Sequence, residues 1–362
     1  MALNLPDFPW DSLEPYRAEA RKHPGGVIDL SVGSPVDATP EVVASALTHA
    51  TQAPSYPLTA GSETLRADMA SWWEHQRGTG PLGLDQVFPS IGSKEMVGLL
   101  PTLLGVTAAD VVVAPRIAYP TYAIGAAVVG ATVVREDDPN RWPEGATLIW
   151  INSPSNPTGE VHDLDYLRAA VSRARDIGAV LASDECYAQL VWDVSSSPSL
   201  LDERVTEGDQ TGLLALYSMS KQSNLAGYRA ALVAGGSALM AELLLARKHV
   251  GLIVPTPIQA ALSAALSDQE HVDVQRERYR RRREVLLPAL HKAGFHLDHS
   301  EGGLYLWATR FEDSAATLAW LSERGILAAP GTFYGEQGSQ HVRVALTARD
   351  DAISEAAMRL AA

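Results

Sequence analysis

Short apolar runs alternate with longer helical patterns through the middle of the chain, and this alternation limits the fold more than any other feature. The apolar continuity of each run indicates a strand buried on both faces, as in a parallel sheet covered by helices. The predicted strands are DVVVAP, ATVVRE, TLIWINSP, AVLASDE, LLALYS and AALVAG. We therefore expect an α/β protein with a mostly parallel sheet between layers of helices.

Helical patterns lie before and between these strands. They are EVVASALTHA, SETLRADMASWWEHQRG, KEMVGLLPTLLG and DLDYLRAAVSRARDIG, the last of which opens on Asp163 and closes on Gly178, as helix caps do. From about residue 240, long helical patterns and the short strands GGLYLWA and QHVRVAL indicate a smaller α+β domain. We expect a large cofactor-binding domain over residues 41–245, and a small domain made of residues 1–40 and 246–362.

Charge and composition exclude several classes of function. The chain has 29 basic and 43 acidic residues and a formal charge of −14, so its surface should repel nucleic-acid phosphates and anionic membranes. The densest basic stretch, RERYRRRRE at residues 276–284, is expected to cover the solvent-facing side of a long helix. The single cysteine, Cys186, excludes an intramolecular disulfide and a multi-cysteine zinc cluster, so we predict no metal site.

The same single cysteine fits a reducing cytoplasm. The sequence shows no basic leader followed by an apolar core, and no uncharged apolar stretch of about 18 residues. We therefore expect a protein that is neither exported nor membrane-spanning.

The segment SMSKQSNLAGYR, residues 218–229, places one lysine directly after the apolar run LLALY. A lysine after a strand is usually a surface residue, but here Ser218, Ser220 and Arg229 accompany Lys221 in the order SxSKxxxxxxxR. Hydroxyls and a guanidinium at a strand end can hold a phosphate ester. A lysine amine kept neutral by desolvation and nearby cations can attack a carbonyl and form a Schiff base. The predicted cofactor is therefore a phosphate-bearing aldehyde, pyridoxal 5'-phosphate.

Two further motifs supply contacts that a pyridoxal ring needs. Asp184, in SDECY at a predicted strand end, is expected to face the ring nitrogen and keep it protonated, although an acid there can also cap a turn or helix. Tyr187 and Asn156 are expected to hydrogen-bond the phenolic oxygen of the ring. Asn156 lies in NSPSNPTGE, where Pro157 and Gly159 shape the turn, and NPTG by itself is simply a good turn.

Other segments are candidates for the phosphate, the ring face and the substrate. IGSKE precedes a helical pattern, so Gly92, Ser93 and Lys94 can offer N–H groups and a hydroxyl to the phosphate. Tyr119, in APRIAYPTY, is a candidate to stack on the ring, although an aromatic residue before proline often only packs. Arg343 alternates with apolar residues in HVRVAL, and a buried arginine needs an anion such as the α-carboxylate of an amino acid.

In these motifs the chain resembles the fold-type I aminotransferases, in the branch that includes aspartate aminotransferase, over nearly its whole length. NPTG, DExY, SxSKxxxxxxxR and RVA carry the resemblance through Asn156, Asp184, Tyr187, Lys221, Arg229 and Arg343. The resemblance implies a large domain with a mostly parallel seven-stranded sheet covered by helices, plus a smaller α+β domain. It also implies that Lys221 carries the cofactor and acts as general base and acid, while Asp184 and Tyr187 tune the ring.

Two N-terminal segments extend this resemblance. SVGSPVD resembles the glycine loop that lies near the substrate carboxylate, through Gly33. SYPLTAGSETLR resembles a YPxxxGxxxLR segment whose tyrosine reaches the phosphate of the neighbouring subunit. Carried over to Tyr56, this implies a homodimer with shared active sites.

The chain is most similar to the actinobacterial-type N-succinyldiaminopimelate aminotransferases of lysine biosynthesis, in PGGVIDLSVGSPVDATPEVV, IGSKEMVGLLPTLLG, AYPTYAIGA and SDECYAQLVWD. This similarity implies ping-pong exchange of an amino group between glutamate and N-succinyl-2-amino-6-oxopimelate. RIAYPTY replaces the tryptophan-bearing loop of aspartate aminotransferase, and no counterpart of the arginine that binds its distal carboxylate is evident. Arg116 and the FPWD segment are candidates to read the succinyl end.

Three alternatives stay open at this level. The first is an aminotransferase specific for aspartate, alanine or aromatic amino acids, because the fold alone does not set specificity. The second is β-elimination or decarboxylation with the same cofactor. The third is a ligand-sensing regulator, which would need an N-terminal DNA-binding module, and the first 40 residues lack a helix-turn-helix pattern.

Overall fold

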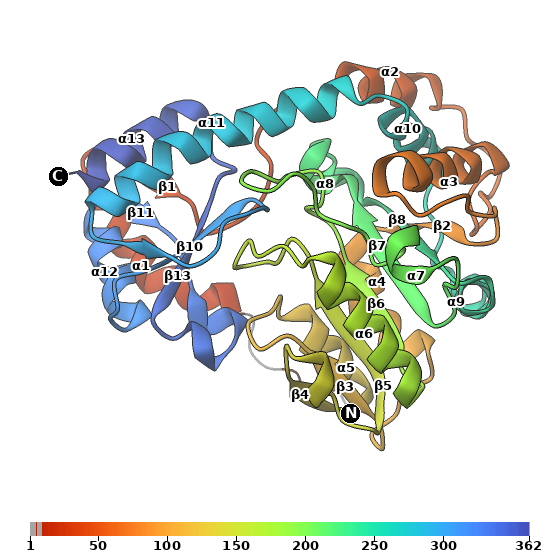
Figure 1. Ribbon diagram of the computed structural model, residues 1–362. Helices are drawn as coiled ribbons and strands as arrows, with labels where there is room; N and C mark the ends of the chain where they lie inside the picture. Colours follow the sequence, from red (N-terminus) through yellow and green to blue (C-terminus); the bar gives the residue numbers. More distant parts are fainter. Residues whose placement is uncertain (1–4, 6–8, 362) are drawn as a thin grey trace.

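A computed structural model of the chain describes residue 5 and residues 9–361. In this part, seven strands form one sheet in the order β2-β8-β7-β6-β5-β3-β4 (Figure 1). Their bounds are β2 (Val87–Ile91), β3 (Val111–Ala114), β4 (Thr132–Arg135), β5 (Ala146–Asn152), β6 (Val180–Asp184), β7 (Leu213–Ser218) and β8 (Ala230–Gly235). Strands β3 to β7 pair in parallel, and β8 is antiparallel to both of its neighbours. The predicted mostly parallel sheet is therefore confirmed.

The predicted strands are all present, but the sequence analysis does not predict β2. Its sequence, VFPSI, contains Pro89, which cannot donate a hydrogen bond to a neighbouring strand. Because β2 lies at the edge of the sheet and pairs only with β8, this missing donor is tolerated.

Helices cover both faces of the sheet, so its strands are buried on both sides. One face packs against α3 (Glu63–Arg77) and α6 (Leu164–Ile177). The other packs against α4 (Ser93–Leu103), α5 (Thr121–Val129) and α9 (Ser237–Val250). Along β5 the side chains alternate between two cores, with Ile149 and Ile151 in the first and Leu148 and Trp150 in the second.

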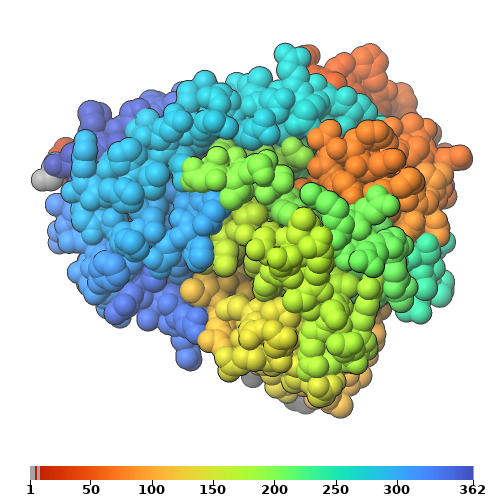
Figure 2. Space-filling view, viewed as in Figure 1, coloured from red at the N-terminus to blue at the C-terminus, as the bar shows by residue number. Residues whose placement is uncertain are grey.

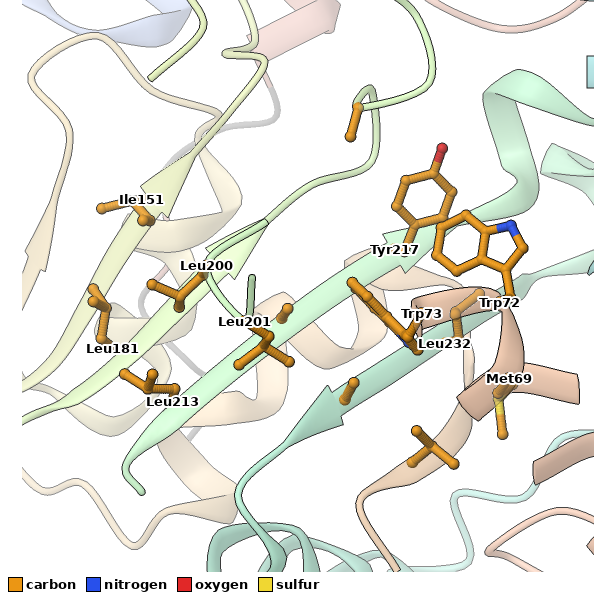
Figure 3. Close-up of a cluster of buried hydrophobic side chains, with 14 of the residues drawn as sticks. Met69, Trp72, Trp73, Ile151, Leu181, Leu200, Leu201, Leu213, Tyr217 and Leu232 are labelled. Atoms are coloured by element: carbon orange, nitrogen blue, oxygen red, sulfur yellow. The ribbon is translucent and has the colours of Figure 1, made fainter. Parts of the chain in front are cut away.

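The first core contains an aromatic group at the end of α3. Trp72 and Trp73 pack against Tyr217 of β7, with the Trp72 and Tyr217 ring centroids 4.5 Å apart (Figure 3). These large rings fix β7 against α3, and β7 leads directly into the segment that contains Lys221.

A second sheet of the described residues has the order β12-β13-β10-β9 and is antiparallel throughout. Its strands are β9 (His296–Leu297), β10 (Tyr305–Thr309), β12 (Ala329–Pro330) and β13 (His341–Ala345). It shares a core with α11 (Glu270–Lys292), α12 (Ser314–Glu323) and α13 (Asp350–Leu360). The two strands predicted from GGLYLWA and QHVRVAL are confirmed as β10 and β13.

The N-terminal segment joins this C-terminal region. β1 (Ile28–Asp29) pairs in parallel with β11 (Ile326–Leu327), and α1 (Glu14–Ala20) packs against α12. In Figure 2 the blue C-terminal residues lie directly against the yellow and green residues of the large sheet region.

The region after residue 245 is divided between the two sheets. Helix α10 (Thr256–Leu266) packs against α2 (Glu41–His49) and α3, whereas α11 runs along one side of the molecule toward α13 (Figure 1). The exact limits of the two domains stay a prediction. No helix in the described ranges is long and apolar enough to cross a membrane.

The basic stretch 276–284 is not wholly on the solvent-facing side of α11, and this part of the prediction is wrong. Arg282 is buried and pairs with Asp37 at 2.7 Å and with Asp350 at 2.6 Å. It lies on the inward face of the helix because Tyr279 and Leu286, three residues before and four after it, are both buried in the same core. Arg282 thus joins α11 to the loop before α2 and to α13.

Candidate active site

Most of the predicted site residues emerge at one edge of the large sheet. Asn152 at the end of β5 pairs in register with Asp184 at the end of β6, and Asp184 pairs with Leu216 of β7. Ser90 of β2 and Ser218 of β7 both pair with Ala231 of β8. Strand β8 is antiparallel to β2 and β7. The residues just before β8 therefore lie beside the residues just after β2 and β7. This carboxyl edge is where open α/β sheets bind ligands.

The expected phosphate residues meet at that edge. A Cβ added to Gly92 would lie 2.1 Å from Nη2 of Arg229, so only glycine allows the guanidinium to approach the first turn of α4 this closely. Gly92 also has a φ of 73°, which glycine adopts without strain. Arg229 donates to the Ala226 carbonyl at 2.8 Å, and among the described residues no carboxylate pairs with it.

Serine side chains border the same place. Ser218 caps the short helix α8 (Met219–Gln222), and its hydroxyl bonds the Ser220 hydroxyl at 2.9 Å. Ser93 opens α4, and its hydroxyl is close enough to lower the pKa of Cys186, which burial raises. Lys94 follows on α4 with an exposed side chain.

Lys221 lies in α8, directly after β7, and its amine donates to the carbonyl of Gly33. Gly33 belongs to the N-terminal segment that follows β1, so this contact joins the N-terminal segment to the large sheet. A Cβ on Gly33 would lie 1.9 Å from the Tyr305 hydroxyl, which makes glycine necessary here. Gly33 is therefore held between Lys221 and Tyr305.

Asp184 is buried at the end of β6 and accepts hydrogen bonds from Tyr122 and Cys186. Tyr122 donates to its Oδ2 at 2.9 Å, and the Cys186 backbone N–H donates to its Oδ1 at 3.2 Å. Burial raises the pKa of Asp184, and these donors oppose that rise. A carboxylate in this position can stabilise a positive charge placed beside it.

Tyr122 is a site residue that the sequence analysis misses. It lies in the first turn of α5 and its ring stacks on Trp150, with centroids 5.0 Å apart. It is three residues after Tyr119, so both side chains lie on the same side of that turn, and the edge of one ring meets the other at 5.8 Å between centroids. This spacing is the signal that could have found it.

Tyr119 is partly buried, and burial raises its pKa to about 12. Asp184 and Tyr305 both influence it, so the structure places it beside the predicted ring site.

Arg343 is 3% exposed and has no carboxylate partner among the described residues. Its Nη1 donates to Oδ1 of Asn156 at 2.9 Å, and its Nη2 donates to the Ser31 carbonyl at 2.8 Å. Its Nε is buried without an acceptor in the described part of the chain. The guanidinium also stacks over the ring of Tyr305, 3.8 Å from the centroid. A buried cation held only by neutral acceptors requires an anion from outside the chain.

Asn156 therefore meets Arg343, and this contact links the large sheet to β13. Asn152 accepts a hydrogen bond from the Asn156 backbone at 2.7 Å and donates to the Asp184 carbonyl at 2.7 Å. The Asn156–Pro157 peptide bond is cis. Asn152 thus fixes the NPTG turn against the end of β6.

The candidates for the succinyl end are placed differently. Arg116 pairs with Glu136 at 2.9 Å and with Asp137 at 3.9 Å, so its guanidinium already has two anionic partners. Phe8 of FPWD lies outside the described residues, whereas Trp10 packs against Phe333 with centroids 5.2 Å apart. Tyr56 is 98% exposed and takes no part in the contacts above.

Residues 25–360 match the sequence pattern of the family described as aminotransferase class I and II. The chain is 50% identical to a probable aminotransferase of Mycobacterium tuberculosis, over 99% of this chain and 86% of that protein. It is 49% identical to 4-dedimethylamino-4-oxo-anhydrotetracycline transaminase OxyQ of Streptomyces rimosus, over 98% of this chain and 99% of that protein.

Solved structures agree with this relationship. A probable N-succinyldiaminopimelate aminotransferase from Thermus thermophilus is 29% identical with a TM-score of 0.87, covering 98% of this chain and 99% of that one. By sequence and by structure, the chain belongs to the class I and II aminotransferases, which use pyridoxal 5'-phosphate to move amino groups between amino acids and oxo acids.

Proposed function

We propose that this aminotransferase exchanges an amino group between glutamate and N-succinyl-2-amino-6-oxopimelate by a ping-pong mechanism. The observation that carries the substrate class is Arg343, a buried guanidinium without an anionic partner in the described residues. An α-carboxylate would supply the missing charge and accept two N–H donors. The N-succinylated substrate is supported by the likeness to the Thermus thermophilus protein, whose name gives that activity.

The residues at the carboxyl edge of the large sheet fit the cofactor. Arg229, Ser218, Ser220 and the first turn of α4 would hold the phosphate, because the glycine at position 92 lets the Arg229 guanidinium lie beside the N-terminus of this helix. Asp184 would face the ring nitrogen, and Tyr119 would cover one face of the ring.

Lys221 would bind the cofactor covalently, and after a substrate amine has replaced it there, the freed Lys221 amine would move the reacting proton. When bound, pyridoxal 5'-phosphate withdraws electrons from the substrate Cα, which makes its proton acidic. Lys221 would take that proton from Cα and return one at C4' of the cofactor, a contribution of about 10² to 10⁴ in rate. In this structure the Lys221 amine donates to the Gly33 carbonyl, which places it at the carboxyl edge of the large sheet.

The remaining residues would orient the substrate and the charges around it. Arg343 and Asn156 would fix the carboxylate so that the Cα–H bond is aligned for transfer. Tyr122 and the Cys186 N–H stabilise the Asp184 carboxylate against the burial that raises its pKa. Tyr187 would donate to the phenolic oxygen of the ring.

We also propose that the enzyme works as a homodimer in which Tyr56 reaches the phosphate of the second subunit. Tyr56 is 98% exposed in a stretch without helix or strand, and Leu58 beside it is 64% exposed. A second subunit placed against this stretch would cover both apolar side chains.

A second candidate substrate is a bulky ketone of a polycyclic compound. It is favoured by the 49% identity to OxyQ, whose name gives a tetracycline precursor as its substrate. Trp10 and Phe333, in contact with each other beside Ile117, offer an aromatic surface that suits such a compound.

The test is a panel of amino compounds added singly to the purified holoenzyme, with cofactor absorbance followed over one turnover. The panel contains glutamate, N-succinyl-LL-diaminopimelate, aspartate, alanine, phenylalanine and an amino-tetracycline. We expect glutamate and the succinylated compound to react fastest, and glutamate to yield 2-oxoglutarate. A faster reaction with aspartate or the tetracycline would overturn the proposed substrate. Release of ammonia or carbon dioxide instead of an oxo acid would indicate a lyase or decarboxylase.

Lys221→Ala tests the proposed anchor. This variant should lose both the absorbance of the covalently held cofactor and turnover, because the amine that attaches the cofactor is removed. An active variant with unchanged absorbance would refute the role of Lys221.

A further inference from the structure

Tyr305 lies at the centre of the site, on the strand β10, for which the sequence predicts no functional role. Its side chain is 4% exposed, and its hydroxyl is 3.2 Å from the hydroxyl of Tyr187. The two rings meet edge to face, with centroids 5.7 Å apart. The ring of Tyr305 also supports the Arg343 guanidinium, and Gly33 lies against its hydroxyl. Tyr305 therefore lies against Tyr187, Arg343 and Gly33, which are proposed to contact the cofactor, the substrate and Lys221 in that order.

The charges around the pair determine which hydroxyl donates. Burial raises the pKa of Tyr305, but the positive charges of Arg343 and Lys221 and the hydrogen bond with Tyr187 together hold it below its usual value. Burial raises the pKa of Tyr187 far above its usual value. The Arg343 guanidinium lies over the ring of Tyr305, 3.8 Å from its centroid, which favours loss of the proton from this hydroxyl, so we infer that Tyr305 donates to the oxygen of Tyr187. A phenol has a single proton, so that of Tyr187 stays available for a third group.

Other polar groups face the pair without replacing this contact. Cys186, Tyr119 and Tyr334 all lie near enough to influence Tyr305 or to be influenced by it. Among the described residues the Tyr334 hydroxyl is buried without a partner, although its ring lies 5.0 Å from the Arg343 guanidinium. Tyr334 is therefore a matched control, a buried tyrosine beside Arg343 whose hydroxyl bonds nothing in the described part.

We propose that Tyr305 is a positioning residue whose hydroxyl donates to Tyr187, so that Tyr187 in turn donates to the phenolic oxygen of the cofactor. The inference rests on the proposed function, since it takes Lys221 and Tyr187 as cofactor residues. A donor at the phenolic oxygen stabilises negative charge there and so favours loss of the proton from the Lys221 nitrogen. Without the Tyr305 hydroxyl, Tyr187 becomes a weaker donor, because neighbouring hydrogen bonds in a chain strengthen one another.

The experiment is a pH titration of holoenzyme absorbance, which changes when the Lys221 nitrogen loses its proton. Tyr305→Phe keeps the ring under Arg343 and removes only the hydroxyl. We expect the titration midpoint to rise by about 0.3 to 1 pH unit, the size of a hydrogen bond expressed as a pKa shift. Tyr187→Phe should raise it further, and Tyr334→Phe should leave it unchanged.

The double variant Tyr187→Phe with Tyr305→Phe shows whether Tyr305 changes the titration midpoint through Tyr187 or independently of it. If Tyr305 acts through Tyr187, the double variant should have the midpoint of Tyr187→Phe alone. Additive shifts, or no shift in Tyr305→Phe while Tyr187→Phe shifts, would overturn the proposal and leave the proposed function intact. A Lys221→Ala variant that retains the cofactor band would overturn the proposed function and this inference together. Near-ultraviolet circular dichroism of each apoprotein checks that the fold is retained.

A second set of measurements addresses the ring rather than the hydroxyl. Tyr305→Phe should leave KM for glutamate within about 2-fold of the wild type, because the cation–π contact with Arg343 is retained. Tyr305→Leu removes that contact and should raise KM by about 2- to 30-fold. Equal values of KM in the two variants would show that the ring does not position Arg343.

Discussion

Replacing Arg343 by methionine should abolish most of the activity while changing the stability little. Methionine is unbranched and replaces the aliphatic stem of the arginine without its charged guanidinium. In the wild type, the substrate carboxylate would meet a fully desolvated guanidinium, and removing one partner of such a pair costs about 2 to 5 kcal/mol. At about 1.4 kcal/mol for each factor of ten, kcat/KM for glutamate should fall about 30- to 4,000-fold.

The effect on folding has two opposing parts. Removing a buried charge without a partner relieves a desolvation penalty of several kcal/mol. The Ser31 carbonyl and Asn156 Oδ1 lose their donors, at about 1 to 3 kcal/mol each. Because the two contributions have opposite signs, the free energy of unfolding should stay within about 2 kcal/mol of the wild type. Loss of an arginine that binds substrate thus lowers activity more than stability, whereas loss of a structural arginine lowers stability.

Arg359→Met is the matched control. Arg359 is also a buried arginine of the C-terminal region, but it pairs with Glu355 at 2.9 Å and donates to the carbonyls of Gly25 and Gly26. Its loss should lower the stability and leave kcat/KM near the wild-type value. Steady-state kinetics with glutamate and urea unfolding followed by fluorescence measure both quantities. A decrease in kcat/KM of less than tenfold in Arg343→Met would refute the assignment of the carboxylate site.

The remaining predictions concern buried charges outside the substrate site. Arg77 and Glu185 form an ion pair at 2.7 Å, with side chains 4% and 1% exposed. Arg77→Met should therefore lower the free energy of unfolding by about 3 to 5 kcal/mol, because it leaves the Glu185 carboxylate buried without its partner. Adding Glu185→Gln should recover part of that loss in urea unfolding. A loss below about 1 kcal/mol for the single variant would contradict this expectation. Burial lowers the pKa of His162 to about 4, below the value of 6.5 expected when unfolded, so its contribution is present above pH 6.5 and is lost as the pH falls toward 4. Between pH 7 and pH 5 the wild type should therefore lose about 2 kcal/mol more than His162→Gln, and parallel curves for the two proteins would disprove it.

The sequence by itself determined the sheet and the order of the site segments. The predicted parallel strands were recognisable because strands buried on both faces need continuous apolar runs. Lys221, Asp184 and Asn156 were recognisable because each follows such a run, and the carboxyl ends of parallel strands meet at one edge. β2 was missed because Pro89 masks an edge strand, for which a local pattern gives little signal.

The burial of the Arg282 side chain could not be predicted from charge alone. Its partner Asp37 is 245 residues away in the chain, and the inward face of α11 depends on Tyr279 and Leu286 meeting the small-sheet core. A run of arginines predicts an exposed helix surface only where nothing packs against it.

Only the tertiary structure decided which groups of the site form hydrogen bonds with one another. Tyr122 reaches Asp184 from a helix 62 residues earlier, Ser31 offers a backbone oxygen to Arg343, and Tyr305 meets Tyr187 from the second sheet. The spacing from Tyr119 points to Tyr122 but not to its partner, because each of these contacts joins segments that become neighbours only when separate elements pack together. Local propensity and apolar periodicity act within one element, whereas hydrogen bonds between buried side chains depend on how separate elements are oriented.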